Sequence, residues 1–246
     1  MSLHRPPLPD ILRPPGAPDL SRQAQRPFDI ATRLPGGLPI FDTVEAPALP
    51  AVESAASAFA RGTLIDTPGG PCAVEDLVPG MRITTLDGPA AELLWVGSLL
   101  FDPARFIEGS GTTSLYRVPG DESGPGCLLG PGARCTVRHP RLQSLLGRDA
   151  VLVPVADEAD WDRILPVPPA GTAPLCHLML DRHALLRVGG IEVESYHPGR
   201  ALDTIAAHGL RDAFYRLFPQ ILSPAEFGQL ALSRTTRDAV ERVLAA

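Results

Sequence analysis

The sequence contains no lysine: all 22 of its basic residues are arginines. A Schiff-base lysine and the lysine of a phosphate-binding P-loop are therefore excluded. No apolar run reaches the length of a membrane span. The opening residues, MSLHRPPLPD, lack the charged head and apolar core of a secretory signal. We therefore expect no membrane partner, and a protein that is cytoplasmic or exported without an ordinary signal peptide.

Cysteines are few, and none of the four forms a C-x-x-C pair. Their spacing lacks the paired ligands of a zinc site, and the two histidines at 177 and 183 are not at metal-ligand spacing either. The G-x-S-x-G of many serine hydrolases is also missing. We expect no metal, no cofactor and mostly buried cysteines. The net charge of −6 argues against a nucleic-acid partner.

Proline is concentrated at the start of the chain, where residues 1–50 hold 11 of the 28. Proline removes a backbone donor and fixes φ, and this stretch has no sustained period of 2 or 3.6 residues. We therefore predict a largely disordered lead over 1–51. The segment AVESAASAFA at 51–60 either continues this lead or forms a short helix.

Short apolar runs broken by Gly, Pro and Asp fill residues 52–200, which favours a mainly β domain with closely spaced strands. One helical turn or two is expected at 157–164. Residues 201–246 then show helical spacing, with Ser223 and Glu226 as a capping box, and predict a helical extension. The strands are expected at 63–65, 81–86, 91–99, 114–118, 134–146, 150–155, 175–180, 184–188 and 191–195.

Four motifs follow one another in the β region. They are F-A-R-G-T-L-I-D-T at 59–67 with P-x-x-V-E-D-L-x-P-G-M-R-I after it, L-W-V-G at 94–97, T-V-R-H at 136–139, and H-L-M-L-D-R-H at 177–183 leading into V-E-S-Y-H-P-G at 193–199. In this order they resemble the Hint domain shared by hedgehog autoprocessing domains and inteins, over residues 57–199. The resemblance implies a β horseshoe with a pseudo-two-fold arrangement of short strands.

It also implies self-processing chemistry. In that family a cysteine or serine just before F-x-x-G-T attacks the preceding carbonyl and converts the peptide bond into a thioester or ester. By the same resemblance, His139 would protonate the amide nitrogen that leaves and Thr136 would help to hold the bond. Read from the residues alone, His139 is an ordinary histidine at a strand end.

A second pair of candidates is Asp181 and His183, of which His183 resembles a histidine that supports cleavage in the family. On an alternating strand the two would face the same side, where a carboxylate can fix the tautomer of an imidazole. The alternative is a surface salt-bridge cluster that also includes Arg182.

The chain departs from the family where the chemistry starts, because Ala58 fills the nucleophile position. Ser57 is one residue out of register, and Cys72 falls in the turn after the first strand. Glu194 and Ser195 stand where inteins end in His-Asn, so splicing is not expected.

Three hypotheses follow from this departure. The first is a Hint protein of the self-processing class that Ala58 leaves inactive. The second is a non-catalytic module that binds a protein or a peptide, including its own N-terminal segment at 51–58. The third is an alanine placed by design to trap a precursor.

Overall fold

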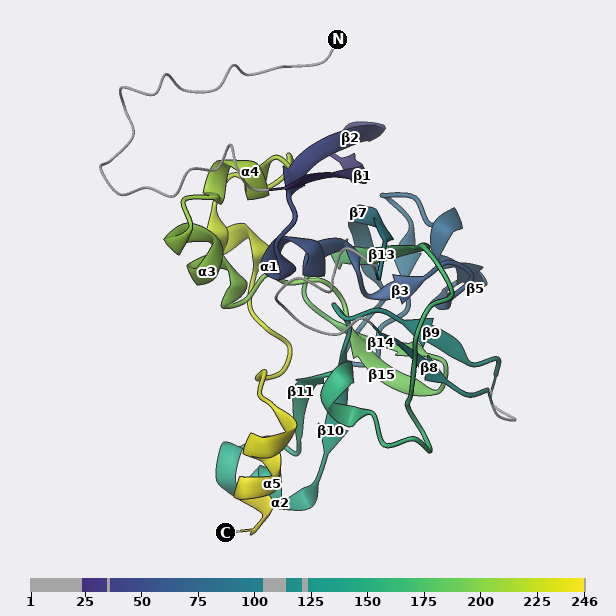
Figure 1. The fold of residues 1–246 in the computed structure, drawn as a ribbon, viewed down its shortest axis with the longest axis vertical. Helices are drawn as coiled ribbons and strands as arrows, with labels where there is room; N and C mark the ends of the chain where they lie inside the picture. The colour runs from purple at the N-terminus through teal and green to yellow at the C-terminus, as the bar shows by residue number, and fades with distance from the viewer. Residues whose placement is uncertain (1–23, 35, 104–113, 121–123, 246) are drawn as a thin grey trace.

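A computed structural model describes residues 24–34, 36–103, 114–120 and 124–245. Its mainly β architecture, with helices towards the C-terminus, confirms the predicted fold class (Figure 1). The largest sheet has nine strands, eight of them in one path. In spatial order these are β12 (Leu165–Val167), β8 (Leu115–Val118), β9 (Cys127–Leu129), β3 (Phe59–Ala60), β13 (Ala173–Leu180), β7 (Ala91–Phe101), β1 (Gln25–Arg33) and β2 (Pro39–Pro47), with β6 (Arg82–Ile83) paired to β7.

Two smaller sheets complete the β structure. One has four strands in the order β11 (Ala150–Pro154), β10 (Arg134–Arg138), β15 (Ile191–Glu194) and β14 (Leu185–Val188); the other is the hairpin of β4 (Leu64–Thr67) and β5 (Gly70–Ala73). The helices are α1 (Pro50–Glu53), α2 (Pro140–Leu146), α3 (Ala201–Ala207), α4 (Arg211–Tyr215) and α5 (Arg237–Ala245). The 3-10 turns among the described residues are η3 (Ser54–Ala56), η4 (Val74–Asp76), η5 (Val155–Glu158) and η6 (Pro224–Phe227).

The predicted lead over 1–51 needs a correction, although residues 1–23 lie outside the described part of the chain. Strands β1 and β2 form an antiparallel hairpin that joins the main sheet through β7. The Ala48 amide donates to the Ala24 carbonyl, so the alternation of an antiparallel ladder places the β1–β2 hydrogen bonds at even-numbered residues. Pro27, Pro39 and Pro47 occupy odd positions, where that ladder needs no donor.

Two further elements differ from the sequence prediction. The strand expected over 134–146 ends at Arg138, because Pro140 starts helix α2 and cannot donate to a ladder. The helix expected over 157–164 is a single 3-10 turn, η5. A tight loop follows it, in which the Asp160 carboxylate accepts from three backbone amides.

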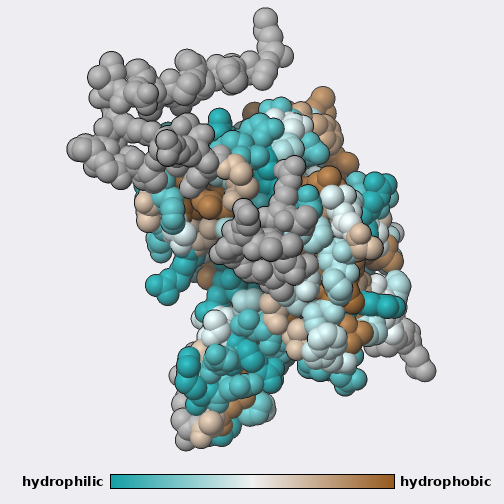
Figure 2. Space-filling model, in the orientation of Figure 1, coloured by the Kyte–Doolittle hydropathy of each residue, from teal (hydrophilic) through white to brown (hydrophobic). Residues whose placement is uncertain are grey.

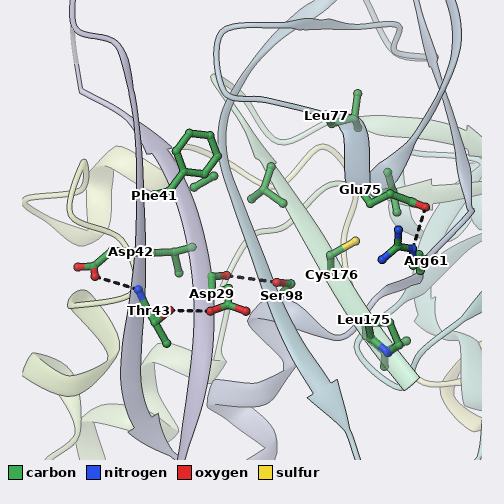
Figure 3. Close-up of a pocket in the computed structure, with 15 residues that line it drawn as sticks. Asp29, Phe41, Asp42, Thr43, Arg61, Glu75, Leu77, Ser98, Leu175 and Cys176 are labelled. Atoms are coloured by element: carbon green, nitrogen blue, oxygen red, sulfur yellow. Dashed lines mark hydrogen bonds and ion pairs between the residues drawn. The ribbon is translucent and has the colours of Figure 1, made fainter. Parts of the chain in front are cut away.

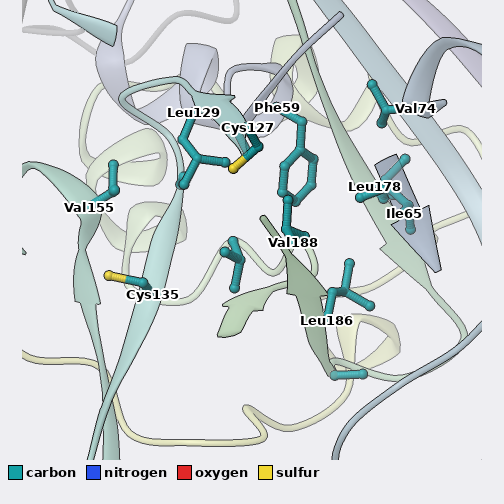
Figure 4. Close-up of a cluster of buried hydrophobic side chains, with 14 of the residues drawn as sticks. Phe59, Ile65, Val74, Cys127, Leu129, Cys135, Val155, Leu178, Leu186 and Val188 are labelled. Carbon is teal, nitrogen blue, oxygen red and sulfur yellow. The ribbon is translucent and has the colours of Figure 1, made fainter. Parts of the chain in front are cut away.

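Buried side chains form two clusters, and each includes residues of the central strands β7 and β13. The first cluster packs the two small sheets together and includes Phe59, Leu129 and Leu178 (Figure 4). The second joins the β1–β2 hairpin and helix α1 to the C-terminal helices, around Trp95 and Phe218.

Trp95 is central to the second cluster and explains the glycine of the L-W-V-G motif. A Cβ on Gly97 would lie 2.0 Å from the Trp95 ring, so only glycine fits at position 97, two residues after Trp95 on the strand. The indole N–H donates to the Leu217 carbonyl at 2.6 Å, which ties β7 to the segment after α4.

The surface is mixed, with an apolar patch at the outer end of the β1–β2 hairpin (Figure 2). Leu38, Ile40 and Phe41 are exposed there. Among the described residues, no helix is both long and apolar enough to cross a membrane.

Candidate functional site

The Ser57–Ala58 peptide bond lies between η3 and β3 and is buried: Ala58 is 0% and Ser57 2% exposed. Two backbone hydrogen bonds hold its N–H and C=O groups, and a third holds the carbonyl of the next peptide unit. The Ala58 amide donates to the Cys176 carbonyl at 3.0 Å, the Gly130 amide to the Ala58 carbonyl at 2.8 Å, and the Gly132 amide to the Ser57 carbonyl at 2.9 Å. The bond is therefore fixed from both sides by the chain.

Two glycines make this close approach possible. A Cβ on Gly130 would lie 2.2 Å from the Ser57 carbonyl oxygen, and one on Gly132 would lie 2.6 Å from the Ser57 hydroxyl. The Gly132 N–H points at the oxygen on which negative charge would develop if the Ser57 carbonyl were attacked. The electrophile and one donor of a self-processing site are thus in place.

Neither Thr136 nor His139 reaches this bond. Thr136 lies on β10, and His139 caps α2, where its Nδ1 accepts from the Arg141 amide at 3.1 Å. Because the chain is extended from Arg134 to His139, His139 lies roughly 16 Å from Arg134 along the direction of β10. Figure 1 shows α2 beside α5 at the lower end of the molecule, away from α1 and β3.

Thr136 has a separate feature of interest. Its hydroxyl is buried and has no hydrogen-bond partner among the described residues. The same holds for the hydroxyl of Tyr196, in the second buried cluster.

One imidazole close to this bond is His177, which in the sequence begins a motif and is not at metal-ligand spacing from His183. It follows Cys176, whose carbonyl receives the Ala58 amide, and its ring makes edge contacts with Phe59 at 5.4 Å and Tyr196 at 5.3 Å. Its Nδ1 accepts from the Leu178 amide, so the hydrogen of the neutral ring is on Nε2. Burial, with Arg234 and His183 nearby, lowers the pKa of His177 well below its ordinary value. In the sequence, the position of His177 inside the apolar run 175–180 was the signal that this histidine is buried.

Asp181 and His183 do not share a face, because β13 ends at Leu180 and the chain bends. Asp181 is exposed, whereas His183 is 5% exposed. The partner of His183 is Glu194, whose carboxylate lies 3.1 Å from Nε2. The Ala231 amide donates to Nδ1, so His183 is also a neutral ring with its hydrogen on Nε2. The expectation of an Asp181–His183 pair on one face was wrong.

Glu194 is the centre of a buried charge network that includes a residue from the C-terminal extension. Its carboxylate is 2% exposed and pairs with Arg234 at 2.9 Å and Arg134 at 3.6 Å. Arg234 also donates to the His197 carbonyl at 2.7 Å. Burial is the main cause that lowers the pKa of His197 to about 4. This network holds the extension against β15 and β10, and nothing in its geometry places it at the Ser57–Ala58 bond.

The cysteines are all free thiols. Burial raises the pKa of Cys127, Cys135 and Cys176 to about 12, so these thiols stay protonated at neutral pH. Among the described residues, no group of three His, Cys, Asp or Glu side chains is placed to hold a metal ion.

A groove of about 520 Å³ runs across the exposed face of β2, β1, β7 and β13 (Figure 3). Asp29 and Thr43 line one end, where the Thr43 hydroxyl donates to the Asp29 carboxylate at 2.7 Å. The ion pair of Arg61 and Glu75, at 3.3 Å, lines the other. Cys176 lines the groove, and its carbonyl accepts the hydrogen bond from the Ala58 amide.

The family of the chain follows from comparison with known proteins. A family model described as Hint domain matches residues 57–200, more than half of the chain. The chain belongs to the Hint domain family, and the expected resemblance is confirmed. Its class is therefore that of the self-processing Hint and intein-like domains.

Three solved structures are similar to the chain. A bacterial intein-like domain from Clostridium thermocellum is 14% identical, with a TM-score of 0.40, and the match covers 57% of this chain and 99% of that one. The MchDnaB-1 intein is 16% identical, with a TM-score of 0.33 and coverage of 56% and 100%. The Msm DnaB1 intein splicing domain bound with zinc is 14% identical, with a TM-score of 0.32 and coverage of 57% and 100%. No protein of curated function matches.

Proposed function

We propose that this Hint domain does not cleave its own chain, and that Ala58 is the first of two missing parts. In a cleaving relative, a thiol or hydroxyl at this position would attack the Ser57 carbonyl carbon and form a new S–C or O–C bond. The C–N bond would break, and the nitrogen of residue 58 would leave as an amine after it gained a proton. The observation that carries the proposal is that Ala58 offers only a buried methyl group.

The second missing part is a proton donor at the leaving nitrogen. The Ala58 amide donates its hydrogen to the Cys176 carbonyl, and His139 lies beyond β10. The roles first assigned to Thr136 and His139 stay a proposal, which requires the β10 end to approach the bond. His183 and Asp181 would then support the site only by stabilising the fold, without contact with the bond, since His183 is paired to Glu194.

The experiment is the intact mass of the unaltered chain and of Ala58→Cys, recorded under denaturing conditions with and without dithiothreitol. We expect both chains to stay whole. A new thiol at this buried position would stay protonated, as burial keeps Cys176. The Ala58 amide donates to the Cys176 carbonyl, and no hydrogen bond joins it to an imidazole of the described residues.

Cleavage of Ala58→Cys between residues 57 and 58, increased by dithiothreitol, would contradict the proposal and leave Ala58 as the sole defect. The double variants with His139→Ala and with His177→Phe would then identify the imidazole that serves the bond. Loss of cleavage with His139→Ala alone would favour the family's usual arrangement.

A further inference from the structure

We infer that the described residues from 58 to 245 form a receptor for the segment that precedes the Ser57–Ala58 bond, and that the described residues from 24 to 57 are its bound partner. The partner is a β hairpin followed by a short helix, held by strand addition and apolar burial. A backbone cut ahead of residue 58 would therefore leave a two-chain complex instead of releasing the N-terminal piece. This goes beyond the proposed function and does not depend on catalysis.

Strand addition is the first observation. The edge offered by β7 accepts β1 in antiparallel register, with Asp29 opposite Ser98 and Thr32 opposite Trp95. β1 lies between β7 and β2, so it is an inner strand of the main sheet (Figure 1). Main-chain pairing of this kind provides affinity in strand-addition complexes, and side chains provide the selectivity.

Apolar burial is the second observation. Six side chains of the segment are buried in the second cluster, against residues of β7, β13 and the C-terminal helices. They are Phe28, Ile30, Ala46, Val52, Ala55 and Ala56, each between 0% and 4% exposed. An isolated two-stranded hairpin is at best marginally stable in water, so this segment depends on the surface that it covers.

Polar contacts define the chemistry of the partner. Arg26 is 6% exposed, donates to the Leu100 carbonyl at 2.5 Å and pairs with Glu53 inside the segment. Thr32 donates to the Gln220 side-chain oxygen at 2.8 Å. The receptor thus selects an arginine and a hydroxyl at fixed positions of an apolar strand, and one of its contacts comes from the C-terminal extension.

The test is made on the full chain with a specific protease site inserted between Ala48 and Leu49, which separates the β1–β2 hairpin from the receptor and leaves α1 and η3 attached to the receptor. The folded protein is cut and passed over a size-exclusion column without denaturant, and each peak is identified by mass. We expect both pieces to elute together at the position of the uncut chain, and to separate only in urea. Separation of the two pieces without denaturant would overturn the inference.

A matched pair of variants tests the contacts. Thr32→Val removes the bond to Gln220, so the cut hairpin should dissociate several-fold faster. Thr43→Val, whose hydroxyl bonds only within the hairpin, should leave the dissociation rate unchanged. Equal rates for both variants would contradict the assigned contact.

A second measurement covers the case in which the insertion prevents folding. In the unaltered chain, backbone amides of β1 should exchange with deuterium as slowly as those of β7 and β13. Much faster exchange of β1 would mean that the hairpin leaves the sheet on its own, and would overturn the inference. A self-cleaving Ala58→Cys would overturn the proposed function alone.

Discussion

At the residue scale, glycines hold the Ser57–Ala58 bond closely although residue 58 carries only a methyl group. Gly130 and Gly132 press against Ser57, and the Gly132 N–H still meets its carbonyl. Both glycines are also required by packing, because any side chain there would collide with Ser57. The cradle can therefore persist without catalysis.

A pH dependence of stability follows from two buried histidines. The pKa of His197 is lowered to about 4 and that of His177 well below 6.5, so the unfolded chain binds more protons than the folded chain in this window. The free energy of unfolding should therefore be highest above pH 6.5 and should decrease as the pH falls towards 4. Each group contributes a slope of at most about 1.4 kcal/mol per pH unit.

The measurement is urea unfolding at intervals between pH 4 and 7. His197→Gln and His177→Phe should each reduce the slope of the unfolding free energy against pH, relative to the unaltered chain. Identical slopes for all three chains would show that other groups, such as carboxylates, cause the dependence.

At the scale of elements, the segment around Arg234 joins the C-terminal extension to the small sheet. The Leu152 amide donates to the Ser233 carbonyl and the Thr235 amide to the Leu152 carbonyl, while Arg234 reaches Glu194. Arg234→Ala would remove a main partner of a carboxylate that is 2% exposed. We expect a loss of about 3–5 kcal/mol of unfolding free energy.

The matched control is Arg187→Ala, an exposed arginine on β14, which should change the unfolding free energy by less than about 0.5 kcal/mol. Both values come from urea unfolding at pH 7. Equal small effects would indicate that the Arg134 ion pair and the His183 hydrogen bond suffice to stabilise the buried Glu194.

The local elements were predictable because their signals are local. The hairpin turn before β7, the strand of Trp95 and the strand of His177 follow from turn residues and apolar runs. The β1–β2 hairpin was not predictable in this way. Its three prolines are compatible with a ladder only in the observed register, and local sequence does not reveal that register. The same reason hid the partner of His183, since Glu194 comes from a neighbouring strand. The proximity of His177 to Ala58 likewise depends on how β13 meets β3.

At the scale of the whole molecule, the C-terminal extension is part of the core and not an appendage. Phe214, Phe218 and Phe227 are buried with Trp95 in the second cluster. Deletion of 201–246 would expose this apolar surface, so we expect the shortened chain to unfold or aggregate. Solubility and near-ultraviolet circular dichroism measure this outcome.

Deletion of 237–246 alone is the control, because α5 packs beside α2, away from Trp95. It should leave the near-ultraviolet signal of the second cluster intact. A folded, soluble chain of residues 1–200 would contradict this account and would make the extension a separable module.

The proline positions of the hairpin have one more consequence, for polymerisation. β2 is the last strand of the sheet. The backbone N–H and C=O groups of its odd-numbered residues point away from β1, towards the open edge. Pro39 and Pro47 offer no N–H, the Asp42 carboxylate accepts the Thr43 amide, and Arg216 donates to the Glu45 carbonyl. The row of backbone groups that could template another chain is thus interrupted along its length. The exposed Ile40 and Phe41 therefore do not make this edge a seed for fibres.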